Sequence, residues 1–425
     1  MKYYKNIFFL LLFFSNVFFA QNYINQNKLT SKFVLKKKQN EYYKNLITNI
    51  YNVFLLAINK STVNSWSKAL TEAESLFIKG EKINKAIAKS LSIEPDKFVK
   101  LQQAALEAAF ATDRNIFSKQ IKKIFDNTND IVSYTIAANY LQRSKKDIYT
   151  NYFLLSDSEK RFGNVHNNPI LISFKFYLKN SIQKIFRKRP PIKDLLNNKF
   201  QNGKTIVYTF LRHNRNYPGI TIVKKPDGTF VKNKNGSILG IPQLAISYSN
   251  LPAYIPNGNT PQGIYSIVGT YISPSKTIGP TPNILVRTPF EVSANIFFHK
   301  KNAYKKFSIN DYKNLIPKSW QNYFPIYQSF YAGKSGRKLI IMHGSTDNLE
   351  YYKSKPYYPM SPTQGCLSTK EIWNSNTGKL IESDQVKLVN AFRSAKQNKG
   401  FLIVIEIDNK NKPVSINDVN NMITN

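Results

Sequence analysis

The chain has 425 residues and carries 61 lysines and arginines against 25 aspartates and glutamates, a formal net charge of +36. Its length predicts roughly two or three domains. The positive charge is spread along the chain, with no dense basic block among aromatic residues, so a nucleic-acid-binding arm is excluded. The excess of lysine indicates either attraction to an anionic envelope surface or a compositional bias of the whole chain.

Residues 1–20 have the pattern of a secretory signal peptide. Two early lysines precede an apolar run from Ile7 to Phe19, and Ala20 ends the run at a suitable cleavage junction. The run is too short to cross a bilayer comfortably. Phe18 is bulkier than the small residue usually found there, so an uncleaved N-terminal anchor remains an alternative. We expect a protein secreted across the inner membrane that works in the periplasm or cell wall, peripheral to the envelope.

Helical periodicity dominates the first half of the mature chain. Residues 21–45 are polar and are predicted to form a leader or loop, and residues 46–190 an α-helical domain. Leu70, Ala73 and Phe77 share one helix face, and similar faces follow. Helices in a row are consistent with stacked repeats, although no sharp repeat period is present. The later faces consist of Ile83, Ile87 and Leu91, then Leu101, Ala105 and Ala109, then Ile121, Ile124 and Phe125.

The character of the sequence changes at Pro190-Pro191, because two prolines after a basic cluster stop a helix. We predict a linker over residues 191–203, a mostly β domain over residues 204–410 and a C-terminal tail over residues 411–425. Short β-rich runs at 205–211, 339–342 and 401–407 carry this prediction. The expected fold class is α+β and multidomain, with a helical N-terminal domain followed by a mostly β domain.

Cys366 is the sole cysteine of the chain, and it follows Gly365. A single cysteine in an exported protein is either an inert buried thiol or a reactive one. A reactive thiol needs a base, most often an imidazole. His343 stands at the end of the apolar run 339–342, where a strand would deliver it into a loop. Gly365 allows a tight turn, so that backbone N–H groups near Cys366 can face a developing oxyanion.

The HG pair at 343–344 followed by TQGC at 363–366 resembles the catalytic signature of the L,D-transpeptidases of the YkuD type. Upstream, NTPQGIYSI at 259–267 resembles the TPxGxFxI strand of that family. The resemblance covers roughly residues 203–410 and does not include the helical part. Two positions depart from the family pattern. Gln364 stands where a second histidine is common, and Ser368 stands where arginine or asparagine is common.

The resemblance implies a cysteine-dependent acyltransferase that cross-links or trims the stem peptides of peptidoglycan and needs no cofactor. Cys366 would be the nucleophile and His343 the general base. Backbone groups of Gly365, Gln364 and Gly344 would stabilise the oxyanion. No motif indicates a metal site or a nucleotide site. Candidate substrate-contacting residues are Thr363, Ser368, Tyr265, Arg337 and His299, with Arg287 as a further carboxylate binder; Tyr254, Tyr351, Tyr352, Tyr357 and Tyr358 are candidates for a groove floor, and His166 and His213 are predicted surface residues.

Two alternatives remain. A sortase-like transpeptidase also places histidine before cysteine in a β domain, but it needs a downstream arginine, and only Arg393 follows Cys366. The second alternative is a non-catalytic scaffold that binds the cell envelope, which the departures at Gln364 and Ser368 motivate.

Overall fold

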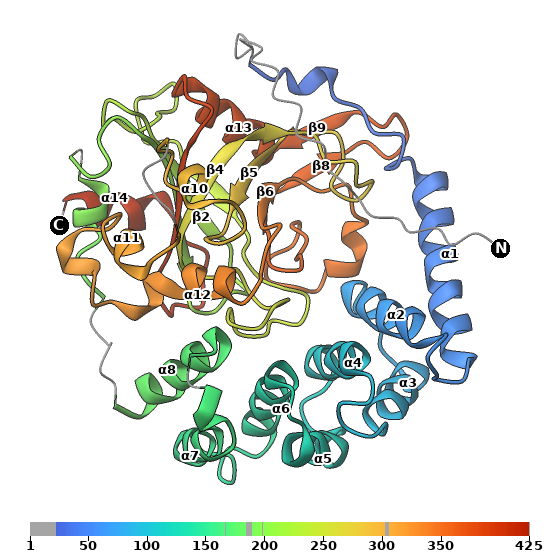
Figure 1. The fold of residues 1–425 in the computed structure, drawn as a ribbon. Helices are drawn as coiled ribbons and strands as arrows, with labels where there is room; N and C mark the ends of the chain where they lie inside the picture. The colour runs from blue at the N-terminus through green and yellow to red at the C-terminus, as the bar shows by residue number, and fades with distance from the viewer. Residues whose placement is uncertain (1–22, 166, 184–188, 198, 302–305, 425) are drawn as a thin grey trace.

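A computed structural model describes residues 23–165, 167–183, 189–197, 199–301 and 306–424. The architecture is α+β: a curved row of helices borders one side of a half that is built on an eight-stranded mixed sheet (Figure 1). No helix in these residues is long and apolar enough to span a membrane. The predicted signal peptide and His166 lie outside the described residues.

The helical row is built in two layers. Its helices are α1 (Lys36–Leu55), α2 (Val63–Ser75), α3 (Glu81–Leu91), α4 (Val99–Thr112), α5 (Ser118–Asn127), α6 (Ile131–Ser144), α7 (Asn151–Phe162) and α8 (Pro169–Gln183). Helices α2, α4, α6 and α8 pack on one another in succession and face the sheet half, while α3, α5 and α7 lie outside them (Figure 1). Each helix contacts its near neighbours, which is the arrangement of a solenoid.

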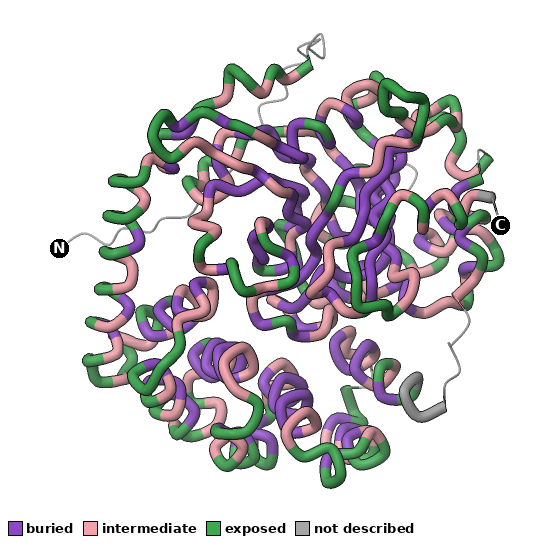
Figure 2. Tube along the Cα trace, turned by 180° about the vertical axis from the view of Figure 1, so that it is seen from behind, coloured by how far each residue is buried: buried purple, intermediate pink, exposed green. Residues whose placement is uncertain are grey.

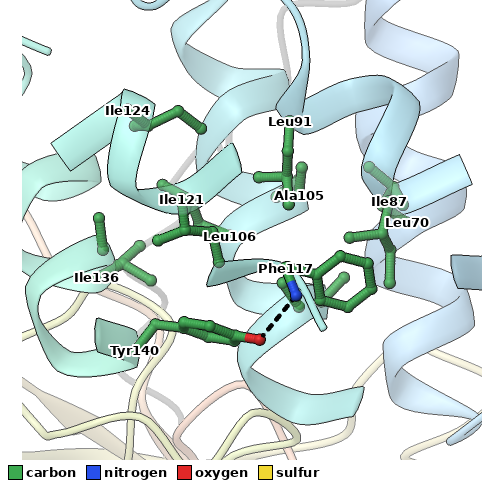
Figure 3. Packing of buried hydrophobic residues seen from close by; sticks show 14 of the residues in the cluster. Leu70, Ile87, Leu91, Ala105, Leu106, Phe117, Ile121, Ile124, Ile136 and Tyr140 are labelled. Carbon is green, nitrogen blue, oxygen red and sulfur yellow. Dashed lines mark hydrogen bonds between the residues drawn. The ribbon is translucent and has the colours of Figure 1, made fainter. Parts of the chain in front are cut away.

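The core of the row is formed by the predicted apolar faces. Leu70, Ile87, Leu106 and Ile121 point into one cluster between α2, α3, α4 and α5 (Figure 3). In the same region the backbone N–H of Phe117 donates a hydrogen bond to the Tyr140 hydroxyl, 3.2 Å away. The helical periodicity of the sequence therefore identified most of the buried stripes correctly. The exception is Phe77, which follows the end of α2 and packs against Tyr352.

The sheet half contains ten strands in the described residues. They are β1 (Thr205–Arg212), β2 (Gly219–Lys224), β3 (Ile241–Gln243), β4 (Gly263–Tyr271), β5 (Asn283–Arg287), β6 (Ile341–His343), β7 (Leu367–Ser368), β8 (Glu371–Trp373), β9 (Leu380–Ser383) and β10 (Gly400–Asp408). The large sheet has the order β3-β2-β1-β10-β4-β5-β6-β7, and β8 and β9 form a separate pair. The pairs β1–β10 and β6–β7 are parallel, and the other pairs are antiparallel.

Both faces of the large sheet are buried, because side chains alternate along each strand and both faces are covered. Tyr208 and Phe210 enter one core, and Val207 and Leu211 enter the other. The second core is closed by α13 (Asp384–Ser394). Buried residues accordingly follow the central strands and the facing sides of the helices (Figure 2). The first core is closed by α9 (Lys193–Leu196), α10 (Ala294–Phe297), α11 (Ile309–Lys313), α12 (Gln328–Lys334) and α14 (Ile416–Thr424).

Three predicted segments differ from the structure. The expected leader at 21–45 contains the first half of α1. Before this helix, the carbonyl of Leu29 accepts a hydrogen bond from the N–H of Leu380 in β9. The expected linker at 191–203 contains α9, whose Leu195 is fully buried. The expected tail at 411–425 contains α14, whose Val419 is also fully buried. Helices α9 and α14 are short, and they are stabilised by tertiary contacts that local sequence patterns do not reveal.

The two halves share one apolar core. Leu251 and Ile255, from the loop between β3 and β4, have no exposed surface and belong to the core of the helical row. The side chain of Asn139 on α6 donates to the Tyr254 hydroxyl of the same loop at 2.8 Å. The loop is therefore held by the helices as well as by the sheet.

An ion pair between a buried arginine and a partly exposed glutamate joins the segment after β1 to β10. Arg215 is 4% exposed, and its Nη2 lies 2.6 Å from Oε1 of Glu406. Another guanidinium nitrogen donates to the Thr260 carbonyl at 3.2 Å. Burial acts to raise the pKa of Glu406, but the charge of Arg215 and the hydrogen bond with His213 offset it and lower this pKa to about 2.

We expect Glu406→Gln to lower the free energy of unfolding by roughly 3–5 kcal/mol, because Arg215 would stay buried without its partner. The wild type should lose this contribution as the pH falls from the ordinary range of a glutamate towards 2, because the folded state lowers the pKa of Glu406. The variant should show a flatter pH dependence. Urea denaturation at a series of pH values measures both effects, and Glu382→Gln, at an exposed ion pair with Lys370, should cost less than about 1 kcal/mol.

Candidate functional site

The pairing of β6 with β7 puts His343 and Cys366 on the same face of the sheet, with His343 opposite Ser368, two residues after Cys366. The two strands run parallel, with Met342 opposite Leu367 and His343 opposite Ser368. Met342 and Leu367 both enter the core beneath α13. Because side chains alternate along a strand, His343 projects from the opposite face, and Cys366, one residue before Leu367, projects to that face too. The backbone N–H of Ile341, opposite Cys366 in this register, acts on the sulfur and lowers its pKa.

The His343 ring is held in one protonation state. It is 7% exposed, and its Nδ1 lies 2.6 Å from the carbonyl oxygen of Gly344. A carbonyl only accepts hydrogen bonds, so Nδ1 carries the proton and Nε2 keeps a free lone pair. Burial lowers the pKa of His343, which the contact with Gly344 partly opposes. The ring is therefore neutral near pH 7 and basic at Nε2.

The Cys366 thiol is protonated in the resting protein. The residue is half-buried, and its Sγ lies 3.4 Å from the carbonyl oxygen of Leu339, to which it donates. Burial raises the pKa of the thiol to about 11, although the Ile341 N–H and the Arg337 charge act in the opposite direction. A neutral thiol next to a neutral imidazole reacts only when the proton moves to the base as the sulfur attacks.

The turn before Cys366 is closed by its own threonine. The Thr363 hydroxyl accepts from the N–H of Gly365 at 2.9 Å and donates to the carbonyl of Cys366 at 3.0 Å. From the NTPQG segment, the Thr260 hydroxyl donates to the carbonyl of Gly365 at 3.0 Å. Gly365 has a φ of +103°, which favours glycine. The Gly365 N–H is thus already bonded, so the prediction that it is an oxyanion donor is wrong for this conformation.

Arg337 lies directly beneath this turn. A Cβ on Gly365 would come within 1.8 Å of its Nη2. Arg337 is 6% exposed, and its guanidinium donates to the backbone carbonyls of Ala253, Ile255, Gly258 and Asn259. The prediction that Arg337 binds a substrate carboxylate is therefore wrong. Its charge instead supports the thiolate form of Cys366 and its hydrogen bonds shape the loop below.

Other predicted contact residues lie away from any substrate. Ser368 and Tyr265 have no exposed surface, and their hydroxyls donate to the carbonyls of Ser361 and Pro261. His299 contacts Ser266 and the carbonyl of Gly400, where β4 meets β10. A side chain without exposed surface cannot touch a substrate, so the predictions for Ser368 and Tyr265 are wrong. Thr363 closes the turn, and Gln364 is exposed beside it.

The predicted tyrosine floor is divided between the two halves. The Tyr352 hydroxyl donates to the carbonyl of Ser75 on α2, and the Tyr43 hydroxyl on α1 donates to Asp347. Tyr357 is 2% exposed and packs beside Tyr352. The loop between Gly344 and Thr363 is thus docked on the helical row. Arg287 pairs with Glu291, and His213 is exposed and contacts Glu406.

A cavity of about 680 Å³ lies where α4, α6 and α8 face the sheet half. Its lining mixes amides with aromatic rings, including Gln142, Asn259, Gln262, Tyr177, Tyr254 and Tyr323. Asn259 and Gln262 flank Thr260, which holds the carbonyl of Gly365. Cys366 does not line this cavity, but the segment 259–262 contributes both to the cavity wall and to the support of the turn before Cys366. Periodicity in the sequence could not reveal this cavity, because its walls come from both halves.

Sequence reasoning also missed Glu371, which is 2% exposed and lies against Gly344. A signal was present in the sequence, since an acidic residue five positions after the cysteine begins a short apolar strand.

The described residues contain no group of three or more His, Cys, Asp or Glu side chains that could hold a metal ion. Comparisons of the chain with family models, with curated proteins and with solved structures found no match.

We expect Gly365→Ala to destabilise the protein by roughly 2–5 kcal/mol, because its Cβ would overlap Arg337 and the Gly258 carbonyl at a positive φ. Gly236→Ala is the matched control: Gly236 also has a positive φ, but nothing lies within 4 Å of its Cβ position. This control should cost only about 1–2 kcal/mol. Urea denaturation measures both variants. Equal losses would show that Arg337 does not pack tightly beneath the turn.

Proposed function

We propose that the chain is an exported cysteine acyltransferase that acts on peptidoglycan stem peptides in the manner of an L,D-transpeptidase. The observation that supports the proposal is the parallel register of β6 and β7, which directs a half-buried thiol and an imidazole with a free Nε2 to the same face of the sheet. The HG and TQGC segments supply the family resemblance. In this proposal the sheet half is the catalytic domain and the helical row is its N-terminal partner.

The reaction begins when the Cys366 sulfur attacks the carbonyl carbon between the third residue of the stem and the terminal D-alanine. The thiol proton moves to Nε2 of His343 as the S–C bond forms. As the tetrahedral intermediate collapses, the C–N bond breaks, and the departing amine takes the proton from His343. An amine from a second stem attacks the thioester, forms a new amide and returns a proton to the sulfur. Water in place of that amine gives a trimmed stem.

The oxyanion needs donors that are not already used. Since the Gly365 N–H bonds to Thr363, the remaining candidates near the sulfur are the backbone N–H groups of Gln364 and Cys366. Each donor in such a site contributes roughly 3–4 kcal/mol to the stabilisation of the transition state. The Arg337 charge beneath the turn adds to the stabilisation of negative charge there.

The cavity between the halves supports a polymeric substrate. Amide groups and aromatic rings are the chemistry that holds sugars and peptide backbones, through hydrogen bonds and stacking. Asn259 and Gln262 line the cavity, and Thr260 between them holds the turn before Cys366, although Cys366 itself does not line the cavity. The charge of +36 adds attraction to an anionic envelope polymer.

One observation favours a second candidate, a non-catalytic scaffold that binds the envelope. The thiol pKa of about 11 means that Cys366 does not ionise by itself near pH 7. The sortase-like alternative has no such support. Arg393 lies on α13, across the sheet from Cys366, and donates to Thr270.

We expect a carbapenem, which acylates such thiols, to add one adduct mass to the wild type and none to Cys366→Ala. His343→Gln should slow adduct formation by about 10²–10⁴-fold, because the general base is lost. Intact mass spectrometry measures both. His299→Gln, at the junction of β4 and β10 and outside the cavity lining, is the matched control and should react like the wild type.

The same variants are then incubated with stem tetrapeptides and an acceptor amine. Release of D-alanine by the wild type but not by Cys366→Ala supports the enzyme. A wild type that forms no adduct and releases no D-alanine, while still sedimenting with purified peptidoglycan, would leave the scaffold in its place.

A further inference from the structure

A buried carboxylate lies directly behind the His343-Gly344 pair. Glu371 is the first residue of β8 and is 2% exposed. A Cβ built on Gly344 would come within 2.2 Å of its Oε2 and 2.6 Å of its Oε1. The absence of a side chain at Gly344 is thus what lets the carboxylate approach the backbone there. Tight contact of this kind requires glycine.

The carboxylate and the imidazole contact opposite ends of one peptide group. His343 Nδ1 donates to the carbonyl oxygen of Gly344 at 2.6 Å. The N–H of Ser345, which belongs to the same peptide unit, faces Glu371 and lowers the pKa of its carboxyl group. A negative charge at the N–H end of a peptide increases the electron density on its carbonyl oxygen. That oxygen is the acceptor for His343.

The surroundings of Glu371 hold polar groups but few partners. Ser383 on β9 donates to Oε1 at 2.6 Å. Oε2 is buried without a well-formed hydrogen bond, and so are the Thr281 hydroxyl and both polar atoms of the Asn283 side chain. Asn283 begins β5, next to the position where Ile284 pairs with Met342. Buried polar groups without a partner are uncommon in folded proteins.

The main groups near Glu371 are uncharged. Besides burial, those with the largest effect on its pKa are Ser383, Thr281, the Ser345 N–H and Trp373. Burial is the largest cause and raises this pKa to about 7. The charged residues nearest to it along β8, β9 and α13 pair with one another. These are Lys370 with Glu382, and Lys387 with Asp384 and Glu382.

We propose that Glu371 is a positioning residue for His343, acting through the Gly344–Ser345 peptide. The ionised carboxylate strengthens the hydrogen bond from Nδ1 to Gly344, which holds the ring orientation and makes Nε2 a stronger base. The carboxylate does not touch the thiol or the substrate. This inference rests on the proposed function only in taking His343 as the base, and its effect on the imidazole exists whether or not the protein transfers acyl groups.

The proposal has a pH signature. Glu371 is neutral below about pH 7 and ionised above it, so the hydrogen bond of His343 should strengthen as the pH rises through that range. NMR of protein labelled with ¹⁵N-histidine observes the Nδ1 and Nε2 shifts of His343 directly. The wild type should show a step in these shifts near pH 7, and Glu371→Gln should lack it while keeping the neutral tautomer.

Thiol chemistry gives a second measurement in the intact chain, because Cys366 is the sole cysteine and every alkylation event reports on it. We expect the rate of Cys366 alkylation by iodoacetamide above pH 7.5 to fall about tenfold in Glu371→Gln. This change corresponds to about one pKa unit in the transfer of the thiol proton to His343. Glu81→Gln, at an exposed ion pair on α3 of the helical row, is the control and should keep the wild-type profile.

The outcomes separate the two proposals. If Glu371→Gln loses the change in the His343 ¹⁵N shifts near pH 7, the positioning role is supported. If the wild-type protein also transfers no acyl group, the proposed function is rejected while the positioning role stands. A step that persists in a folded Glu371→Gln, with an unchanged alkylation profile, overturns the positioning role even if transfer is observed. Should Glu371→Gln fail to fold, Gly344→Ala displaces the carboxylate from the same peptide and is predicted to remove the step as well.

Discussion

The parallel pairing of β6 with β7 is the constraint on which the candidate site depends. The register is held because Met342 and Leu367 both enter the core under α13, and a slip by one residue would move every side chain of β7 to the wrong face. Two short strands thus place a thiol and an imidazole from distant parts of the sequence on one side of the sheet. The hydrogen bonds of Gln385 on α13 to the carbonyls of Pro282 and Met342 hold β5 and β6 in place as well.

The electrostatics of the site balance burial against a few fixed charges. Burial favours the neutral forms of Cys366 and His343, while Arg337 favours the thiolate. A neutral resting pair protects the thiol from unwanted reaction with solvent species. The proton then moves only when a carbonyl group is present to take the electron pair of the sulfur, which couples activation to substrate binding.

Sequence patterns predicted the secondary structure of this protein better than the roles of its polar side chains. The helical stripes, such as Ile83, Ile87 and Leu91, were identified because a period of 3.6 residues is a local property. The apolar run at 339–342 predicted the strand that ends in His343 only in part, since β6 begins at Ile341 and Leu339 is exposed at a positive φ. Ser368, Tyr265 and Arg337 were misjudged because residue type alone does not say whether a polar side chain faces a cleft or bonds to buried backbone carbonyls. Glu371 was missed because its importance comes from contact with Gly344, and only the fold brings them together.

The shared burial of Leu251 and Ile255 in the helical row has a practical consequence. Excising residues 203–424 as a separate fragment would uncover two large aliphatic side chains and leave Tyr254 and Asn257 without Asn139 and Glu107. Such a fragment would expose an aggregation-prone apolar patch beside the loop whose carbonyls bind Arg337. The helical row is therefore needed for the sheet half to fold. Its replacement by another module during evolution would require compensating substitutions in the β3–β4 loop.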